Sequence, residues 1–172
     1  MPQINEEYGY EDHYPYPWGE ARLYPTRSAD TRRRLAWQMT MAGGYQTTGE
    51  RANVPGYGGW VTGRGNDEMV LLKLHQHLYD FWTSLAWWKL DPLKGVGPAD
   101  VPCLGLAGET YVFYLEHGGS MPVQLPAGNY DARWYDPRTG SYEDAGIARG
   151  ANWASPGAPD TQDWILLLER QK

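Results

Sequence analysis

The amino-acid sequence predicts an α/β segment over residues 1–92, followed by a small antiparallel β-sandwich over residues 93–172. Before Asp91 and Pro92, apolar residues recur at the three- and four-residue spacings of amphipathic helices. After a connector rich in proline and glycine, at residues 93–101, they alternate in short runs separated by turn residues. Because the period changes at this connector, we place the domain boundary there.

The α/β segment begins with a strand, a helix and a second strand. Residues 2–8 predict a short extended segment, and residues 31–41 predict a helix capped by Ser28 or Asp30. Residues 42–49 predict a second strand, whose glycines allow close packing of the backbone. This order favours a parallel βαβ unit. The buried stripe of the helix is expected to comprise three residues: Leu35, Met39 and Ala42.

The strongest helical pattern in the sequence starts at Asn66. Its apolar stripe is expected to comprise Leu71, Leu74, Leu78, Phe81, Leu85 and Trp88. Asp91 and Pro92 should end this helix, because the residue before a proline disfavours the helical conformation. A stripe of this length predicts a large apolar surface packed against it.

Five strands are predicted beyond the connector, at residues 109–115, 123–125, 129–136, 141–145 and 163–169. The sequence Asp-Pro-Arg-Thr-Gly at residues 136–140 predicts a hairpin turn. Its proline presets the first turn angle, and its glycine accepts a positive φ. Short antiparallel strands at this density are typical of a small sandwich.

The charge and cysteine content exclude several classes of protein. The chain has 15 basic and 21 acidic residues, a net charge of −6, so it has no positive field to attract nucleic acid. The run from Arg32 to Arg34 is interpreted as a solvated helix face.

Cys103, the single cysteine, excludes an internal disulfide. With no signal peptide and no membrane-spanning run, the compartment stays unassigned; a secreted or periplasmic parent protein is one expectation.

Aromatic residues are unusually rich in polar types, with 9 Trp and 13 Tyr against 2 Phe. Such side chains favour half-wet surfaces, for example sugar or peptide clefts. Many lie in two long predicted loops, at residues 9–26 and 50–65, which we expect to face a ligand. The alternative is that these rings pack the small β domain and its interface.

Several segments together resemble a known family of enzymes. Residues 2–11 (PQINEEYGYE) and the arginine-rich helix leading to AGGY at residues 42–45 resemble the seventh and eighth βα units of apiosidase-like (β/α)8 glycoside hydrolases. Residues 106–114, 130–140 and 163–167 resemble the β-sandwich often appended to those TIM barrels and labelled a "putative collagen-binding domain". The resemblance implies a glycosidase of carbohydrate metabolism, with residues 1–92 as the C-terminal remnant of its barrel.

The sequence departs from this family in length. A (β/α)8 barrel needs about 250 residues and eight strands, whereas residues 1–92 offer strand material for two. By the resemblance, six strands are absent, including the fourth, which carries the acid/base carboxylate in the wider clan. The chain alone is therefore expected to be inactive, either as a portion of a longer protein or as one subunit completed by a second polypeptide.

The resemblance also assigns candidate site residues. Glu7 matches the nucleophile position of the family, at the end of its strand, while Glu6 should point to the opposite face. Glycoside hydrolysis normally needs a second carboxylate, and spacing does not choose among Glu11, Asp12, Glu20 and Glu50. The residues expected to line a polysaccharide or glycoside substrate are Tyr10, Glu11, His13, Trp18 and Glu50. Alternatively, Glu7 is an ordinary surface carboxylate and the aromatic side chains pack their own loop.

No metal or other cofactor is expected. His75 and His77 are two residues apart on a predicted helix, whereas helical metal pairs are three or four apart. A rival hypothesis assigns the β domain a non-catalytic role, binding polysaccharide or collagen-like material. It rests on Trp134, Tyr135, Trp153 and Trp164, which on the alternative interpretation fill the sandwich core or its contact with the barrel segment.

Overall fold

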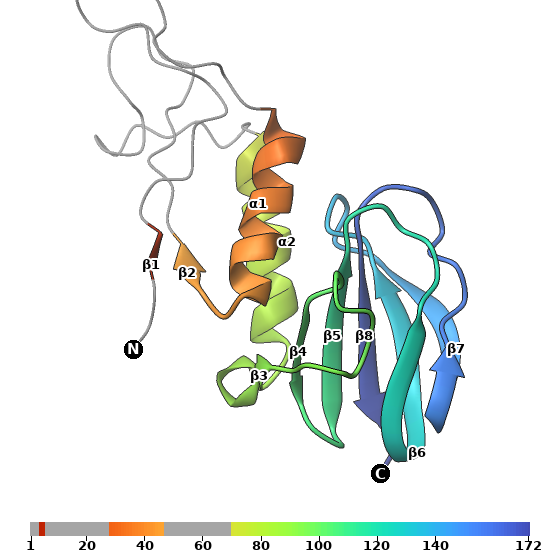
Figure 1. Ribbon diagram of the computed structural model, residues 1–172. Coiled ribbons are helices and arrows are strands. Elements are labelled where there is room, and N and C mark those ends of the chain that lie inside the picture. Colours follow the sequence, from red (N-terminus) through yellow and green to blue (C-terminus); the bar gives the residue numbers. More distant parts are fainter. Residues whose placement is uncertain (1–3, 6–27, 47–69) are drawn as a thin grey trace, which may run out of the picture. The chain divides into compact units, whose positions relative to one another are not determined.

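The computed structural model describes residues 4–5, 28–46 and 70–172 (Figure 1). The chain forms two compact units, Met1–Thr40 with Gly44–Gln76, and Met41–Gly43 with His77–Lys172. We describe each unit by itself. No helix in the described ranges has the length and apolar character needed to cross a membrane.

Helix α1, Ala29–Met41, begins at a serine cap. The Thr31 N–H donates to Ser28 Oγ at 3.1 Å, so Ser28 rather than Asp30 fills the capping position. Asp30 lies instead in the first turn, near the positive end of the helix dipole, where it pairs with Arg33.

The buried face of α1 differs from the predicted one. Ala36, Trp37 and Met41 are buried, whereas the predicted Leu35 and Met39 are only partly buried and Ala42 is exposed. Arg32 and Arg33 are also buried, so their interpretation as a solvated face was wrong. The buried face is centred on Trp37, the largest apolar side chain of the helix, and long arginine stems can line such a face.

The first unit contains a parallel strand pair. Strands β1, Ile4–Asn5, and β2, Tyr45–Gln46, pair Ile4 with Tyr45 and Asn5 with Gln46. Between α1 and β2 the chain turns at Gly43, whose φ of +77° suits glycine. The order strand, helix, parallel strand is thus confirmed. Residues 42–44, predicted as part of the second strand, form the turn after α1 instead, and the rest of both predicted strands lies outside the described residues.

Helix α2, Val70–Thr83, buries most of the predicted stripe. The predicted residues Leu71, Leu74, Leu78, Phe81 and Leu85 are buried, but Trp88 is 68% exposed. The prediction that Asp91 and Pro92 end the helix was wrong, because the helix already ends at Thr83. The hydroxyl of Thr83 donates to the Tyr79 carbonyl and that of Ser84 to the Phe81 carbonyl, each at 2.7 Å, and a separate 3-10 turn, η1 at Trp87–Lys89, follows.

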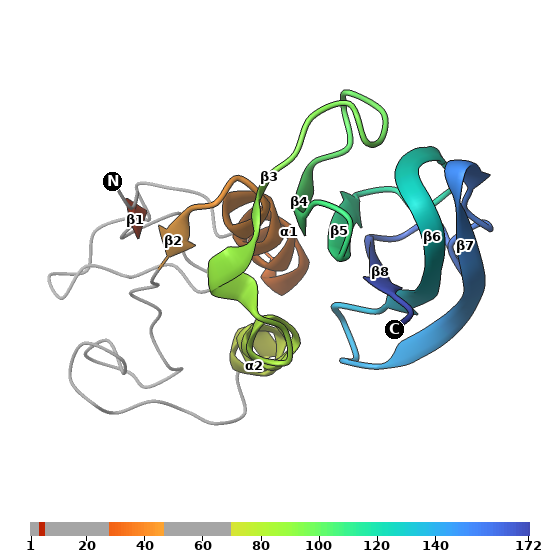
Figure 2. The same cartoon turned by 90° about the horizontal axis from the view of Figure 1, so that it is seen from below.

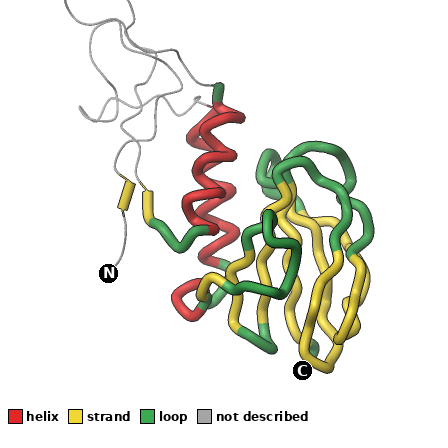
Figure 3. The backbone as a smooth tube through the Cα atoms, viewed as in Figure 1, coloured by secondary structure: helices red, strands yellow, loops and turns green. Residues whose placement is uncertain are grey.

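The second unit is built on an antiparallel six-stranded sheet (Figures 1 and 3). Its strands are β3 Asp91–Pro92, β4 Cys103–Leu106, β5 Thr110–Leu115, β6 Pro122–Tyr135, β7 Tyr142–Ala154 and β8 Trp164–Arg170. They lie in the order β3-β4-β5-β8-β6-β7. Two predicted strands, 123–125 and 129–136, are one irregular strand; 141–145 extends to Ala154, and β3 and β4 were not predicted.

Strand β6 gives this sheet its sandwich-like form. Residues 122–125 pair only with the end of β7, whereas residues 130–135 pair with both β7 and β8. Figure 2 shows β6 and β7 curving beside β5 and β8. The start of β6 thereby contributes Val123 and Leu125 to the same core as Phe113 and Leu166.

Most of the aromatic residues assigned to the β domain pack inside it. Trp134, Tyr135 and Trp164 are each 2% exposed, and Trp153 is half-buried against the core. On the other face of the sheet, Phe81 of α2 packs on Tyr135 with ring centroids 4.8 Å apart. Trp134 and Trp164 are therefore core residues and Trp153 packs against the core, whereas Tyr135 lies at the contact with α2; the alternative interpretation of these rings is confirmed.

The predicted hairpin turn is present between β6 and β7. The Gly140 N–H donates to the Asp136 carbonyl at 2.8 Å, and Gly140 has a φ of +76°. Asp136 Oδ1 accepts hydrogen bonds from the Arg138 N–H at 2.8 Å and from Arg138 Nε at 2.7 Å. The motif therefore forms a hydrogen-bonded turn in which Arg138 donates to the Asp136 carboxylate.

Candidate functional site

The residues assigned to the predicted catalytic site all lie outside the described parts of the chain. They are Glu7, Tyr10, Glu11, His13, Trp18 and Glu50. What the structure describes is the strand pair that precedes them. In the sequence, Glu7 follows β1 by two residues, and Glu50 follows β2 by four.

This strand pair is anchored to the helix that connects it. Gln46 Nε2 donates to the Ala36 carbonyl at 3.2 Å and to Thr40 Oγ1 at 3.4 Å, both on α1. Thr40 Oγ1 in turn donates to the Ala36 carbonyl at 2.9 Å. Side-chain hydrogen bonds therefore hold β2 against α1 and give the first unit a defined scaffold.

Helix α2 carries two histidines, His75 in the first unit and His77 in the second. Burial lowers the pKa of His75, and the positive charge of Arg32 lowers it further, against a hydrogen bond with the Leu71 carbonyl at 3.0 Å. His75 is therefore neutral at physiological pH. His77 belongs to the second unit, where its backbone carbonyl accepts the Tyr135 hydroxyl at 2.7 Å. In the described ranges no group of three or more His, Cys, Asp or Glu is placed to hold a metal.

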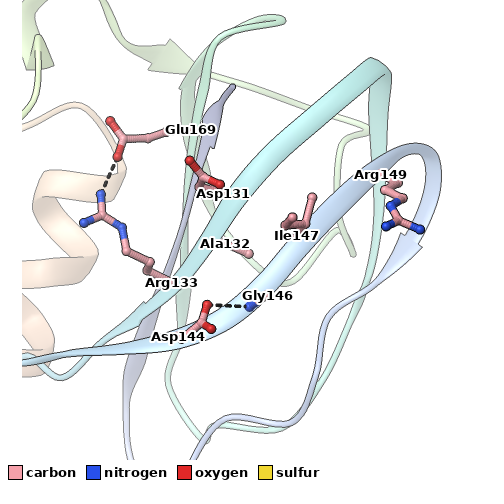
Figure 4. Close-up of a pocket in the computed structure, with 8 residues that line it drawn as sticks. All are labelled: Asp131, Ala132, Arg133, Asp144, Gly146, Ile147, Arg149 and Glu169. Carbon is pink, nitrogen blue, oxygen red and sulfur yellow. Dashed lines mark hydrogen bonds and ion pairs between the residues drawn. The ribbon is translucent and has the colours of Figure 1, made fainter. Parts of the chain in front are cut away.

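A charged groove lies on the second unit, on the face of β6, β7 and β8 away from the core (Figure 4). It has a volume of about 860 Å³. Six side chains define it, which we call the β-face groove: Asp131, Arg133, Asp144, Ile147, Arg149 and Glu169. Sequence reasoning missed it. The available signal was alternation, because Asp131 and Arg133 flank the buried Ala132 on β6.

Some of these charges are already engaged. Arg133 forms an ion pair with Glu169, and its guanidinium lies 4.9 Å from the ring centroid of Tyr142. Asp144 Oδ1 accepts the Gly146 N–H at 2.8 Å. These contacts fix one end of the groove, as Figure 4 shows for the pairs Arg133–Glu169 and Asp144–Gly146.

A second polar cluster joins the hairpin turn to a distant loop. Arg138 Nη1 donates to Asp160 Oδ2 at 2.8 Å, and Trp164 Nε1 donates to Asp160 Oδ1 at 2.7 Å. The Arg138 guanidinium also lies 5.1 Å from the Trp164 ring centroid. Burial alone would raise the pKa of Asp160, but the hydrogen bonds from Trp164 and Arg138 outweigh it and lower that pKa. The cluster is structural, since its polar groups are used by one another.

One known family matches part of the sequence. Residues 103–169, fewer than half of the chain, match the family described as "putative collagen-binding domain of a collagenase". No curated protein matches the sequence.

Three solved structures resemble nearly the whole chain. One, described as a glycoside hydrolase, has a TM-score of 0.75 at 17% identity over 99% of this chain and 42% of its own. A glycoside hydrolase family 5 structure from Bacteroides vulgatus ATCC 8482 gives 0.74 at 17% identity, over 98% and 41%. A "putative glycoside hydrolase" from the same strain gives 0.70 at 14% identity, over 98% and 36%.

The chain thus spans about two-fifths of the length of the structures it resembles. At these identities the likeness concerns the fold. Residues 103–169 match a collagen-binding-domain family, and the whole chain shares its fold with part of several structures named glycoside hydrolases.

Proposed function

We propose that the chain is the C-terminal portion of a glycoside hydrolase of the apiosidase-like class. Residues 1–92 would supply the last two strands of its barrel, and residues 93–172 its appended β domain. The parallel β1–β2 pair is the main support, because parallel strands joined through a helix are the repeating unit of such a barrel. The chain also resembles structures named glycoside hydrolases over about two-fifths of their length, which supports the proposal that it is a portion of such an enzyme.

The strand pair also supports the need for further strands. Parallel sheets occur almost only where both faces are covered and several strands lie side by side. A pair of two-residue strands satisfies few backbone groups by itself. Six more strands, from a longer parent chain or from a second polypeptide, would complete the barrel.

In the completed barrel Glu7 would act as the nucleophile. The carboxyl ends of parallel strands meet at one edge, where barrel enzymes carry out catalysis, and Glu7 and Glu50 follow β1 and β2 in the sequence. Tyr10, Glu11, His13 and Trp18 would line the sugar subsite. The acid/base carboxylate, about 5 Å from the nucleophile in a retaining enzyme, would come from one of the further strands.

The proposal is tested with the 172-residue chain and with a protein that carries the complete barrel. We expect the chain alone to leave aryl glycosides intact and the complete protein to hydrolyse one of them. Glu7→Gln in the complete protein should abolish turnover, whereas Glu6→Gln, the neighbouring control, should retain it because successive strand residues point to opposite faces. Hydrolysis by the isolated chain that depends on Glu7 would show that its site is already complete.

The alternative function is a binding or support module. The four aromatic residues that motivated it are buried or half-buried, so they offer no exposed ring platform. A binding role would therefore depend on other residues of the β domain. Retention of the chain on insoluble polysaccharide or on collagen tests this role, and retention on neither would leave a structural role.

A further inference from the structure

The β-face groove uses side chains that the core does not need. On β6, Tyr130, Ala132 and Trp134 point into the core, and the residues between them point to the other face. One end of that face is covered, because Tyr135 and Tyr142 pack against Phe81 of α2. The other end is the open groove, where Asp131 is exposed and Ile147 is 46% exposed. The surface at this end is therefore available to a ligand.

Donors and acceptors alternate along the groove and nearly balance in charge. Three of its side chains are carboxylates and two are guanidiniums, so its formal charge is −1. A polyanion would be repelled both by this excess and by the net charge of −6 on the chain. A polyhydroxylated neutral molecule fits better, because each hydroxyl can donate to a carboxylate and accept from a guanidinium.

Two groups in the middle and at the far end remain open to a ligand. The Arg149 side chain makes no hydrogen bond or ion pair within the described part of the chain and is exposed. Asp131 accepts one hydrogen bond, at 2.6 Å from the exposed Gln171, which leaves its second oxygen available. Its partner on β7, Ile147, adds an apolar surface beside the carboxylate. A sugar ring presents this same combination of hydroxyl edge and C–H face.

The length of the groove fits a chain of sugar residues better than a single sugar. Arg133 pairs with Asp144, Asp131 with Ile147, and Asn129 with Arg149. From residue 133 to residue 129 of β6 is about 13 Å at roughly 3.3 Å per residue, longer than one sugar ring. Figure 4 shows Arg133 and Arg149 toward opposite ends, with Asp131 and Ile147 between them.

We propose that the β-face groove binds a stretch of neutral polysaccharide, with Asp131 and Arg149 as its principal contacts. The choice of ligand rests on the proposed glycoside hydrolase function, because an attached binding site would hold the enzyme on its polymer. The groove shares no residue with the catalytic site proposed at Glu7, and all its residues belong to β6, β7 and β8.

Affinity electrophoresis of the full 172-residue chain tests the proposal without a turnover step. The gels contain galactomannan, xyloglucan, arabinogalactan or mixed-linkage β-glucan, with polygalacturonate and gelatin in parallel. We expect retardation by at least one neutral polymer and none by polygalacturonate. Asp131→Asn and Arg149→Gln should each weaken that affinity about tenfold, the loss expected for one hydrogen bond to a charged group.

Matched controls lie in the connector between β3 and β4. Asp100→Asn and Lys94→Gln make the same kinds of change at exposed positions and should bind as the wild type does. All four substituted residues are exposed or nearly so, and equal unfolding midpoints would show that folding is preserved.

Three results would overturn the proposal. They are no retardation by any neutral polymer, equal affinity of the groove variants and the wild type, and retardation by gelatin alone that the groove variants lose. The last result would assign the groove to a polypeptide. A failure here is distinct from failure of the hydrolase proposal, which is measured on small aryl glycosides.

Discussion

Replacing Arg138 by Met should destabilise the β domain by about 3 kcal/mol. Arg138 donates from Nε to Asp136, a carboxylate whose side chain is 10% exposed, and loss of that hydrogen bond should cost about 2 kcal/mol. The pair with Asp160 is more exposed and contributes at most about 1 kcal/mol. The contact with the Trp164 ring adds about 0.5 kcal/mol. The hydrogen bond from the Arg138 backbone N–H to Asp136 remains in the variant, so the sum of these three losses is an upper limit on the destabilisation.

Urea denaturation followed by tryptophan fluorescence measures this change as a difference in unfolding free energy. Arg149→Met is the matched control, because Arg149 is an exposed arginine on β7, the strand that follows the turn; it should change stability by less than about 0.5 kcal/mol. A loss below about 1 kcal/mol for Arg138→Met would refute the reasoning that this cluster stabilises the fold.

The acid limb of stability gives an independent check of the same cluster. The folded pKa of Asp160 lies below its ordinary value of 3.8, so its contribution is present above pH 3.8 and is lost as pH falls through the folded pKa. In Arg138→Met the folded pKa of Asp160 should lie closer to 3.8, so the loss should be smaller and should be complete at a higher pH. Unfolding curves between about pH 2 and pH 5, a range that brackets the ordinary carboxyl pKa, would resolve this difference. Identical acid limbs for the two proteins would contradict this assignment.

Three further predictions concern single residues. The lowered pKa of His75 means that the unfolded chain binds its proton first, so the unfolding free energy should fall as pH drops below 6.5, and His75→Gln should remove this slope in denaturation curves. Gly140→Ala should cost about 1–2 kcal/mol in the same assay, because φ is positive there and the new methyl would lie 3.0 Å from His77 Cδ2; Gly157→Ala, with open space around it, should be nearly neutral. Burial raises the pKa of Cys103 to about 12, so a thiol reagent at pH 8 should label it only in urea, and rapid labelling of the folded chain would contradict its burial.

Periodicity predicted the elements whose partners are local in the sequence. The spacing of Leu71, Leu74 and Leu78 predicted the buried face of α2, and the Asp-Pro-Arg-Thr-Gly turn predicted the hairpin between β6 and β7. On α1 the same reasoning failed, because Arg32 and Arg33 are buried and polarity alone marks them as exposed. Strand β4 was missed because Cys103–Leu106 is too short to show an alternating pattern, and its place is set by pairing with β5.

The sites show the same limit. The β-face groove combines side chains from three strands, of which β6 and β8 pair Asp131 with Glu169 across a long sequence separation. Nothing local joins those two residues, so only the register of the folded sheet brings them together. The catalytic assignment of Glu7 and the domain boundary at residue 93 stay predictions, since the first depends on residues outside the described parts and on further strands.

Strand β6 pairs with β7 at both of its ends but with β8 only over residues 130–135, and this has a mechanical consequence for the second unit. Residues 122–125 of β6 lie across the core from residues 130–135. The two layers of the sandwich-like sheet, one on each side of this core, are therefore joined by one continuous strand. Neither layer can slide or swing away without breaking the hydrogen bonds of the other. A load applied to the C-terminal strand β8 would therefore pass through β6 into β7, and the β domain should transmit force as a single block.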